Sequence, residues 1–412
     1  MDCKINHFVP FCKIFYYFCI GNIIVNRMEH TFVYKKFVTG KNFIGRKTDV
    51  TILSNLMLAA ENVTMYEPPK SGITSAIQQA AFNMRIQGKS FFTSEMDLTN
   101  VRSISGFLKK FGDSVIRMVA TTPDEYADLV GRLLMNTHFV FDREAYSEND
   151  EIISLNWDVD DNDISSMLSL PYRLAVEYKT QVFVIINEFQ NVFMTENGEK
   201  ICKIFEKVIR EERASMNVPC SFVFCGSQVN AMKQIFEHVR FFYRQVEHVS
   251  LSRIEDKDLI DYIVKGLLAN GKVIDRDLLL GVSRLFDGHP YYINHFIAIC
   301  DSLSKGYIME PILIDALSML IAVHEPEFKA RMFDLTTFQV SLLKAVVDGH
   351  TKFSSTEVIE KYALNSSANV RRLKDALCKK ELITFNEKDE PHILDPLFAY
   401  WVKKFYFEIK EA

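Results

Sequence analysis

The sequence lacks the cysteine and histidine patterns that indicate a disulfide framework or a metal site. Its eight cysteines are scattered, and no C-x-x-C pair or Cys/His cluster occurs at metal-ligand spacing. The ten histidines form no H-E-x-x-H motif, and spacing alone reveals no Ser/His/Asp or Cys/His grouping. Several cysteines lie in apolar runs, where a reduced cysteine behaves as a small buried hydrophobe. We therefore expect a reducing, cytoplasmic environment.

An excess of charge of either sign is also absent. The formal net charge of the 412-residue chain is −5, so contact with nucleic acid would require a local basic patch. The 48% hydrophobic and 25% charged content is typical of a globular protein. This length predicts two or three domains, and no internal repeat is visible.

The acidic run Asp158-Val-Asp-Asp-Asn-Asp163 invites a metal interpretation. It lacks the glycine at position six and the glutamate at position twelve that a calcium loop requires. We expect instead a solvated loop that caps a helix beginning at Ile164.

One long apolar run occurs, at the N-terminus. From Phe8 to Val25 the chain is aromatic and aliphatic, interrupted by Lys13. A membrane span needs about 20 apolar residues, so a membrane or signal segment is one interpretation. Because only Lys4 could serve as a basic flank and no cleavage site is visible, we favour translation from Met28. No membrane contact is then expected.

Short β-rich runs alternate with helical runs over the first half of the chain. Strands are expected at Val63–Tyr66, Ser90–Asp97, Gln181–Asn187 and Ser221–Cys225. Helices are expected between them, at Ser75–Gln87, Ser103–Met118, Pro123–Met135 and Glu199–Arg213. This alternation predicts an α/β fold, a parallel sheet with helices on both faces.

The strand signal stops after Phe236. Four helices are expected next, at Asp256–Asn270, Arg276–Phe286, Tyr291–Ser304 and Pro311–Ile321, and they would form an all-helical lid. A third block begins near Asp334. The predicted division is an extension over residues 1–27, the α/β domain over 28–236, the lid over 237–330 and a terminal domain over 331–412.

A phosphate-binding loop is expected directly after the strand Val63–Tyr66. Glu67-Pro-Pro-Lys-Ser-Gly-Ile-Thr-Ser75 lies between this strand and a helix, the context in which main-chain amides at a helix start hold phosphate oxygens. Gly72 and Thr74 match the G-x-x-x-x-G-K-[ST] pattern, and the Thr74 hydroxyl would bind Mg²⁺. The expected phosphate cradle consists of Pro69, Lys70, Ser71, Gly72, Ile73, Thr74 and Ser75.

The loop departs from that pattern at two positions. Glu67 replaces the first glycine, and Ile73 replaces the lysine that neutralises the β- and γ-phosphates. Glu67 would bring negative charge close to the phosphates, and Lys70 could reach inward as a substitute cation. The alternative interpretation is an ordinary strand-to-helix turn.

The strand from Gln181 ends as a Walker B strand does, in a polar pair. Asn187 takes the place of the Mg²⁺-ordering aspartate, and Glu188 takes the place of the catalytic base. A solvent-facing carboxylate is the alternative role for Glu188. The strand Ser221–Cys225 leads to Ser227, a polar residue that could sense the γ-phosphate or simply form a turn.

Together these residues resemble the archaeal-type ATPase family, a branch of the AAA+/STAND P-loop NTPases. Phe43-Ile-Gly-Arg46 with Asp49 is similar to the entry motif of that family. Asn187-Glu-Phe-Gln190 stands where the family has Asp-Glu-Phe-Gln, and Phe224-Cys-Gly-Ser227 resembles its sensor strand. The likeness extends over nearly the whole chain from about Met28.

The resemblance implies two further nucleotide contacts. Phe242-Tyr-Arg244 is similar to a family segment whose arginine approaches the phosphates, which implies that role for Arg244. Gly288-His-Pro-Tyr-Tyr292 resembles the Gly-x-Pro motif of the lid, which implies that Pro290 lies near the adenine. ATP and Mg²⁺ are the implied cofactors, with Thr74 and Asn187 as metal contacts.

The C-terminal block resembles the winged helix of the same family. Leu335-Thr-Thr-Phe-Gln339 and Asp395-Pro-Leu-Phe398 carry this likeness. Ser366 or Ser367 would cap a helix whose Val370, Leu373 and Leu377 share an inward face. Its outward basic residues are the candidate DNA contacts, namely Arg371, Arg372, Lys374 and Lys379. A solvated charged face or a protein-binding surface is the alternative.

The predicted function is that of an ATP-binding regulatory protein in which site occupancy changes the packing of the lid and the winged helix. The losses at Ile73 and Asn187 make efficient hydrolysis improbable. The alternatives are an inactive scaffold that binds protein or DNA through the winged helix, and a working ATPase that uses Lys70. Assembly into a homo-oligomer is a further alternative that the sequence does not decide.

Overall fold

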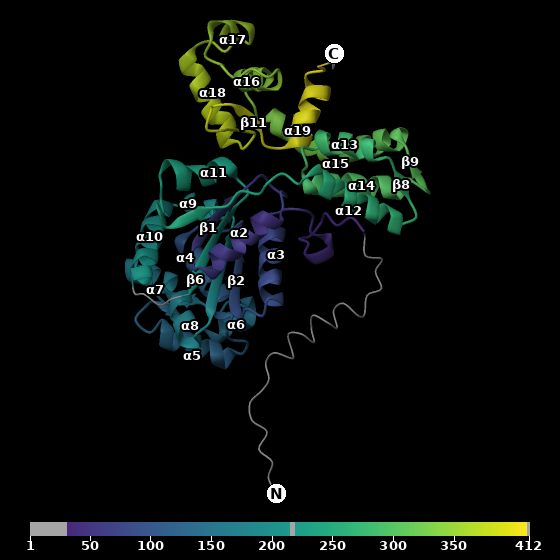
Figure 1. Ribbon diagram of the computed structural model, residues 1–412. Coiled ribbons are helices and arrows are strands. Elements are labelled where there is room, and N and C mark those ends of the chain that lie inside the picture. Colours follow the sequence, from purple (N-terminus) through teal and green to yellow (C-terminus); the bar gives the residue numbers. More distant parts are fainter. Residues whose placement is uncertain (1–30, 215–218, 410–412) are drawn as a thin grey trace.

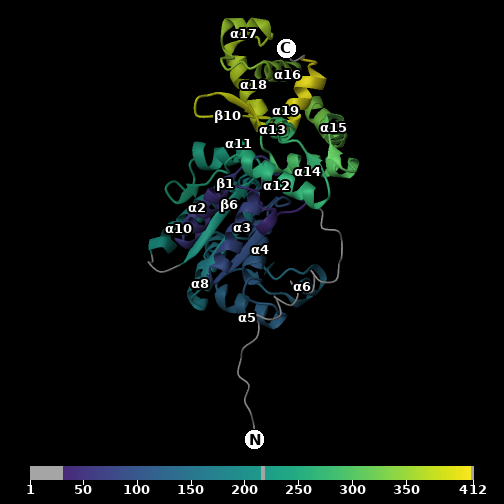
Figure 2. The same ribbon diagram turned by 45° about the vertical axis from the view of Figure 1, so that its right-hand side comes forward.

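The computed structural model describes residues 31–214 and 219–409. An α/β domain, a helical lid and a winged helix follow one another along the chain (Figure 1). Two views place the winged helix over α11 (Val229–Lys233) of the α/β domain and beside the lid (Figure 1, Figure 2). The apolar stretch Phe8–Val25 lies outside the described residues.

Five parallel strands form the central sheet, in the order β2-β5-β6-β1-β7. They are β1 (Asn62–Tyr66), β2 (Phe91–Asp97), β5 (Gln181–Asn187), β6 (Cys220–Gly226) and β7 (Val246–His248). The predicted α/β class is confirmed. The expectation that strands end before Phe236 is wrong, since β7 follows it; three residues carry too little periodicity to be recognised, and β7 depends on its pairing with β1.

Helices cover both faces of the sheet, because successive strand side chains point to opposite sides. Phe183 and Ile185 of β5 join the core beneath α2 (Lys47–Leu58) and α3 (Ile73–Ile86). Val184 and Ile186 join the opposite core. The helices on that side are α4 (Ile104–Ile116), α5 (Pro123–Leu133), α7 (Asp161–Leu168), α8 (Leu170–Tyr178) and α10 (Gly198–Ala214).

Several short elements complete the α/β domain. They are η1 (Gly40–Asn42), β3 (Phe139–Val140), α6 (Arg143–Asn149), β4 (Ser154–Leu155), α9 (Gln190–Phe193) and η2 (Gln234–His238). β3 and β4 form a small antiparallel pair away from the central sheet.

The lid contains four helices and one short strand pair. They are α12 (Asp256–Ala269), β8 (Val273–Ile274), α13 (Arg276–Leu285), α14 (Pro290–Leu303), β9 (Tyr307–Ile308) and α15 (Glu310–Phe333). The expected end of the last helix at Ile321 is wrong, because α15 continues through Pro326. This helix therefore runs across the proposed boundary at residue 330.

The winged helix has the predicted helix and hairpin. Its elements are α16 (Thr337–Val347), α17 (Thr356–Lys361), α18 (Ser367–Lys379), β10 (Ile383–Phe385), β11 (Pro391–Ile393), α19 (Pro396–Trp401) and η3 (Val402–Tyr406). Ser366 caps α18 by accepting the Asn369 amide, as expected. Val370, Leu373 and Leu377 are buried, so the predicted inward face is confirmed.

The lid and the winged helix share one hydrophobic core. The ring centroid of Phe328, on α15, lies 5.5 Å from that of Phe398 and 5.7 Å from that of Trp401, both on α19. Tyr292 of α14 donates a hydrogen bond to Asp395, the residue that caps α19. The lid and the winged helix thus pack as one unit. In the described part of the chain, no helix has the length and apolar character to cross a membrane.

Candidate functional site

A cavity of about 360 Å³ lies where β1 ends and α3 begins. Gly72 is the N-cap residue of α3, and its φ of +104° is a left-handed conformation that favours glycine. The first amides of α3, like those of any helix, have no intrahelical partner. Because glycine has no side chain, Gly72 does not cap them either. The helix start therefore offers free donors and partial positive charge to the cavity.

Most of the residues predicted from the sequence line this cavity. They are Pro69, Lys70, Ser71, Gly72, Ile73, Thr74, Ser75, Asn187, Glu188, Ser227 and Pro290. Arg244 is not among them: it is exposed, and its guanidinium lies 5.2 Å from the centroid of the Tyr243 ring. The structure therefore does not bring Arg244 together with the other predicted residues.

A half-buried arginine, Arg46, supports the phosphate loop. Arg46 donates to the Ser71 carbonyl at 2.6 Å and to the Ser252 carbonyl at 2.8 Å. Burial lowers the pKa of Arg46, while the carboxylates of Glu67 and Asp49 counteract that shift. The guanidinium thus places a positive charge beside the loop.

Glu67 is neutralised in part by this arrangement. Its carboxylate accepts the Leu251 amide at 2.9 Å. Burial raises the pKa of Glu67, whereas that hydrogen bond and the charge of Arg46 act in the opposite direction. The carboxyl group expected near the phosphates is therefore bonded to the segment that follows β7.

Lys70 interacts with the lid. Its ammonium lies 4.0 Å from the centroid of the Tyr291 ring, a cation–π geometry. Lys70 also lines the cavity. Lys70 therefore connects the phosphate-binding loop to α14 while its side chain still lines the cavity.

The polar residues at the strand ends form a connected group. Glu188 has a φ of +58° and accepts hydrogen bonds from Ser227 Oγ at 2.8 Å and Gln190 Nε2 at 2.6 Å. Asn187 donates to Glu95 Oε1 at 3.0 Å. The candidate base and the candidate sensor are thus bonded to each other in this structure.

Residues 33–38 close the cavity together with the lid; the sequence analysis placed the lid there through Pro290 but missed residues 33–38. Residues 33–38 line it together with Tyr291 and Asn294. The Tyr34 ring stacks on His295 of α14, with centroids 4.2 Å apart, and the Val38 amide donates to Ser75 Oγ. No motif marks residues 33–38; their position follows only from packing against the lid.

Oxygen donors suited to Mg²⁺ occur on three elements around the cavity. They are the Thr74 hydroxyl, the Asn187 carboxamide and the Asp97 carboxylate, all of which line it. Asp97 ends β2 directly beside Asn187 in the strand register. The donor set therefore fits a hard cation, with a carboxylate one strand away from the usual position.

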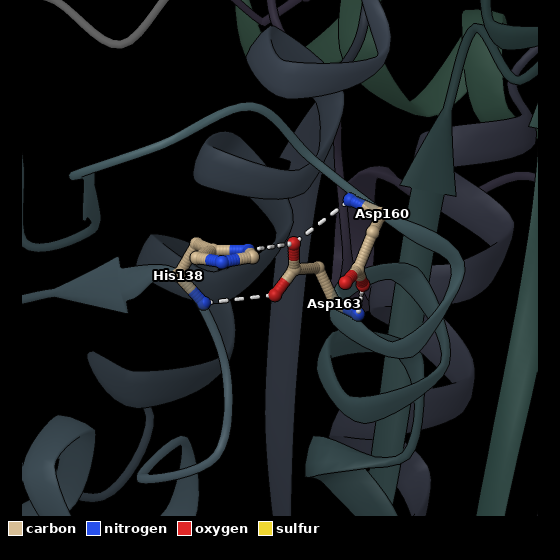
Figure 3. A group of neighbouring side chains, drawn as sticks. All are labelled: His138, Asp160 and Asp163. Carbon is tan, nitrogen blue, oxygen red and sulfur yellow. Dashed lines mark hydrogen bonds and ion pairs between the residues drawn. The ribbon is translucent and has the colours of Figure 1, made fainter.

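A second polar cluster lies away from the cavity (Figure 3). Asp160 caps α7, and Asp163 accepts hydrogen bonds from the Asp160 amide and from the amide and ring of His138. These bonds lower the pKa of Asp163 although burial opposes them. The helix begins at Asp161, three residues before the expected Ile164. We interpret this cluster as a helix cap, as the sequence predicts, but Asp163 is buried and not solvated as expected.

The basic residues of α18 face the α/β domain across a cleft of about 1230 Å³. Arg371, Lys374 and Lys379 line this cleft, and Arg372 is exposed. Lys374 is bonded to Asp389 of the hairpin at 2.7 Å and lies over the Phe385 ring. One of the four candidate DNA contacts is thus engaged within the winged helix.

Comparisons with known proteins agree with this architecture. A family described as a probable winged helix domain matches residues 326–404. A search of curated proteins found no match. Among solved structures, the chain is similar to the Walker-type ATPase of Pyrococcus abyssi, with 12% identity and a TM-score of 0.64 over 90% of this chain and 99% of that one.

The chain is also similar to the ORC2 protein of Aeropyrum pernix, solved as ADPNP–ADP complexes. The identity is 12% and the TM-score 0.55, over 93% of this chain and 99% of that protein. At this level of identity the likeness establishes the fold: a P-loop NTPase sheet followed by a lid and a winged helix, as predicted.

Proposed function

We propose that this protein binds ATP weakly and acts as a regulatory protein in which nucleotide occupancy changes the packing of the lid–winged-helix unit. The observation that supports this most directly is the cavity at the uncapped start of α3, enclosed by the loop, the strand ends and the lid. Its volume of about 360 Å³ falls within the usual range of ligand pockets.

The chain's own residues would hold the triphosphate mainly through the main chain. Amides of Gly72, Ile73 and Thr74 would donate to phosphate oxygens, and the α3 dipole would favour the negative charge. Arg46 donates to the loop from outside the cavity lining, and Lys35, Lys36 and Lys70 are the cations that line the cavity. Mg²⁺, when bound, would neutralise phosphate charge, and Thr74, Asn187 and Asp97 would be its protein contacts.

Hydrolysis is expected to be slow. Two charge-assisted contacts are missing, at Ile73 and Asn187, each worth about 1.5–3 kcal/mol. Together they would weaken Mg–nucleotide binding by roughly 10²- to 10⁴-fold unless other groups compensate. Glu188 would remain the base: Ser227 and Gln190 both donate to its Oε2, so Oε1 would be the oxygen that accepts the proton of a water molecule.

A scaffold that binds protein or DNA through the winged helix is the second candidate. The observation in its favour is that Arg371, Arg372 and Lys379 form no ion pair within the described residues. In this function the nucleotide cavity would have no role.

Titration with a fluorescent ATP analogue, with and without Mg²⁺, tests the proposal. We expect saturable binding. Lys70→Ala removes a cation from the loop and should weaken binding about tenfold, which corresponds to a loss of about 1.4 kcal/mol of binding free energy. Lys89→Ala, an exposed lysine beyond the end of α3, is the matched control and should bind as the wild type does.

The double variant Ile73→Lys with Asn187→Asp serves as the positive control, since it restores both missing charges. Tighter binding than the wild type would show that the cavity is shaped for Mg–ATP. If neither wild type nor this variant binds at millimolar nucleotide, the proposal is wrong and the scaffold remains.

A further inference from the structure

The winged helix contacts the α/β domain through the short helix α11. Asn230 Nδ2 donates to the carbonyls of Cys378 at 3.0 Å and Ile383 at 2.8 Å. Lys233 Nζ donates to Thr384 Oγ1 and to the Phe385 carbonyl. The contact is therefore polar and specific, and it involves both α18 and the hairpin.

Glu381 supplies the cap that α11 lacks. The N-cap residue of α11, Gln228, makes no side-chain capping bond. The carboxylate of Glu381 accepts instead from the amides of Asn230 at 3.1 Å and Ala231 at 2.9 Å. These are the second and third amides of the helix, the ones that a capping side chain normally satisfies. A negative charge at this end also favours the helix dipole.

The helix that Glu381 caps lies close in sequence to the candidate nucleotide site. Only Gln228 separates Ser227 from the start of α11. Ser227 donates from its hydroxyl to Glu188 at 2.8 Å, and both residues line the cavity. Any shift of α11 is therefore transmitted to Ser227 through two peptide units.

We infer that Glu381 is a positioning residue: from the winged helix, it holds α11 so that Ser227 binds Glu188. The effect of Glu381 on nucleotide affinity rests on the proposed function. When the winged helix moves away, α11 loses its cap, Ser227 is released and Glu188 keeps only its hydrogen bond from Gln190. Nucleotide affinity and winged-helix docking are then coupled, and by linkage each changes the other by the same factor.

Amide hydrogen exchange of the full, nucleotide-free chain tests this positioning directly. In Glu381→Ala we expect exchange over residues 227–233 to accelerate about fivefold or more, because two amides lose their acceptor. Glu381→Gln, which keeps one acceptor oxygen, should show a smaller increase. Asp389→Asn is the matched control, since the Asp389 side chain bonds only Lys374 among the described contacts and makes no bond to α11, and it should leave this segment unchanged.

The inference is overturned if residues 227–233 exchange at the wild-type rate in Glu381→Ala. It is overturned equally if exchange rises across the whole chain in both Glu381 variants, since that would indicate general destabilisation.

Titration with the ATP analogue measures the coupling. We expect the dissociation constant of Glu381→Ala to differ from those of wild type and Asp389→Asn by about threefold or more, and an equal constant would contradict the coupling. If the wild type itself does not bind, the proposed function fails, and the exchange experiment alone decides whether Glu381 positions Ser227.

Discussion

At the scale of single residues, His289, directly before the cavity-lining Pro290, is a histidine held in its neutral form. Burial lowers the pKa of His289 to about 4, although Asp395 and a hydrogen bond with the Pro69 backbone act in the opposite direction. Proline has no amide proton, so the ring donates to the Pro69 carbonyl. His289 Nδ1 is buried and has no partner among the described residues. This residue links the phosphate loop to the lid.

His289 predicts a loss of stability in mild acid. Its pKa is lower in the folded protein than the value of about 6.5 in the unfolded chain, so the unfolded chain binds more protons below pH 6.5. The stability is therefore present at neutral pH and is lost as the pH falls, by up to about 1.4 kcal/mol per unit. Urea unfolding at pH 7 and pH 5 should show a smaller loss in His289→Gln than in wild type; equal losses would contradict this.

At the scale of elements, the start of α3 depends on the left-handed conformation of Gly72. A Cβ atom there would lie 3.1 Å from Arg46 Nη1, and the φ of +104° is unfavourable for any residue with a side chain. The same glycine creates the uncapped helix start that opens into the cavity. Fold and candidate function thus depend on one backbone conformation.

Gly72→Ala should lower the free energy of unfolding by about 1–3 kcal/mol, through backbone strain and displacement of Arg46. Gly131→Ala is the control: Gly131 lies within α5, and a Cβ there meets nothing within 4 Å. That change should stabilise by about 0.4–1 kcal/mol. Denaturant unfolding of both variants measures the contrast, and similar effects of the two changes would refute the role given to Gly72.

At the scale of the whole molecule, the lid and the winged helix behave as one body because they share a core. The sheet domain meets this body at the phosphate loop, at residues 33–38, where Tyr34 stacks on His295, and at α11. A change at any of these contacts therefore moves the winged helix together with the lid, and we expect no independent motion of the two.

Phe328→Ala tests the shared core. Phe328 is fully buried between α15 and α19, and its truncation should cost about 3–5 kcal/mol. The chain has two tryptophans, and Trp157→Phe leaves Trp401 as the reporter in this core. In that background, fluorescence at Trp401 and helix content by circular dichroism should show the lid and winged helix unfolding together at lower denaturant. A loss of helix signal at a denaturant concentration that leaves the Trp401 fluorescence unchanged would contradict the single body.

The sequence by itself determined the elements and most of the loop. Periodicity predicted β1, β5 and α3, and the order of strand, loop and helix predicted the cradle around Gly72, because these signals depend on neighbours along the chain. It also identified Pro290, through its motif in the lid.

Only the tertiary structure decided the remainder. Four features join segments that are far apart in the sequence. They are the pairing of β7 with β1, the closing of the cavity by residues 33–38, the cation–π contact of Lys70 with the Tyr291 ring, and the cap that Glu381 places on α11. A local motif placed Arg244 at the phosphates, but the structure places it outside the cavity. Such contacts depend on how distant segments pack together, and no pattern of neighbouring residues records that packing.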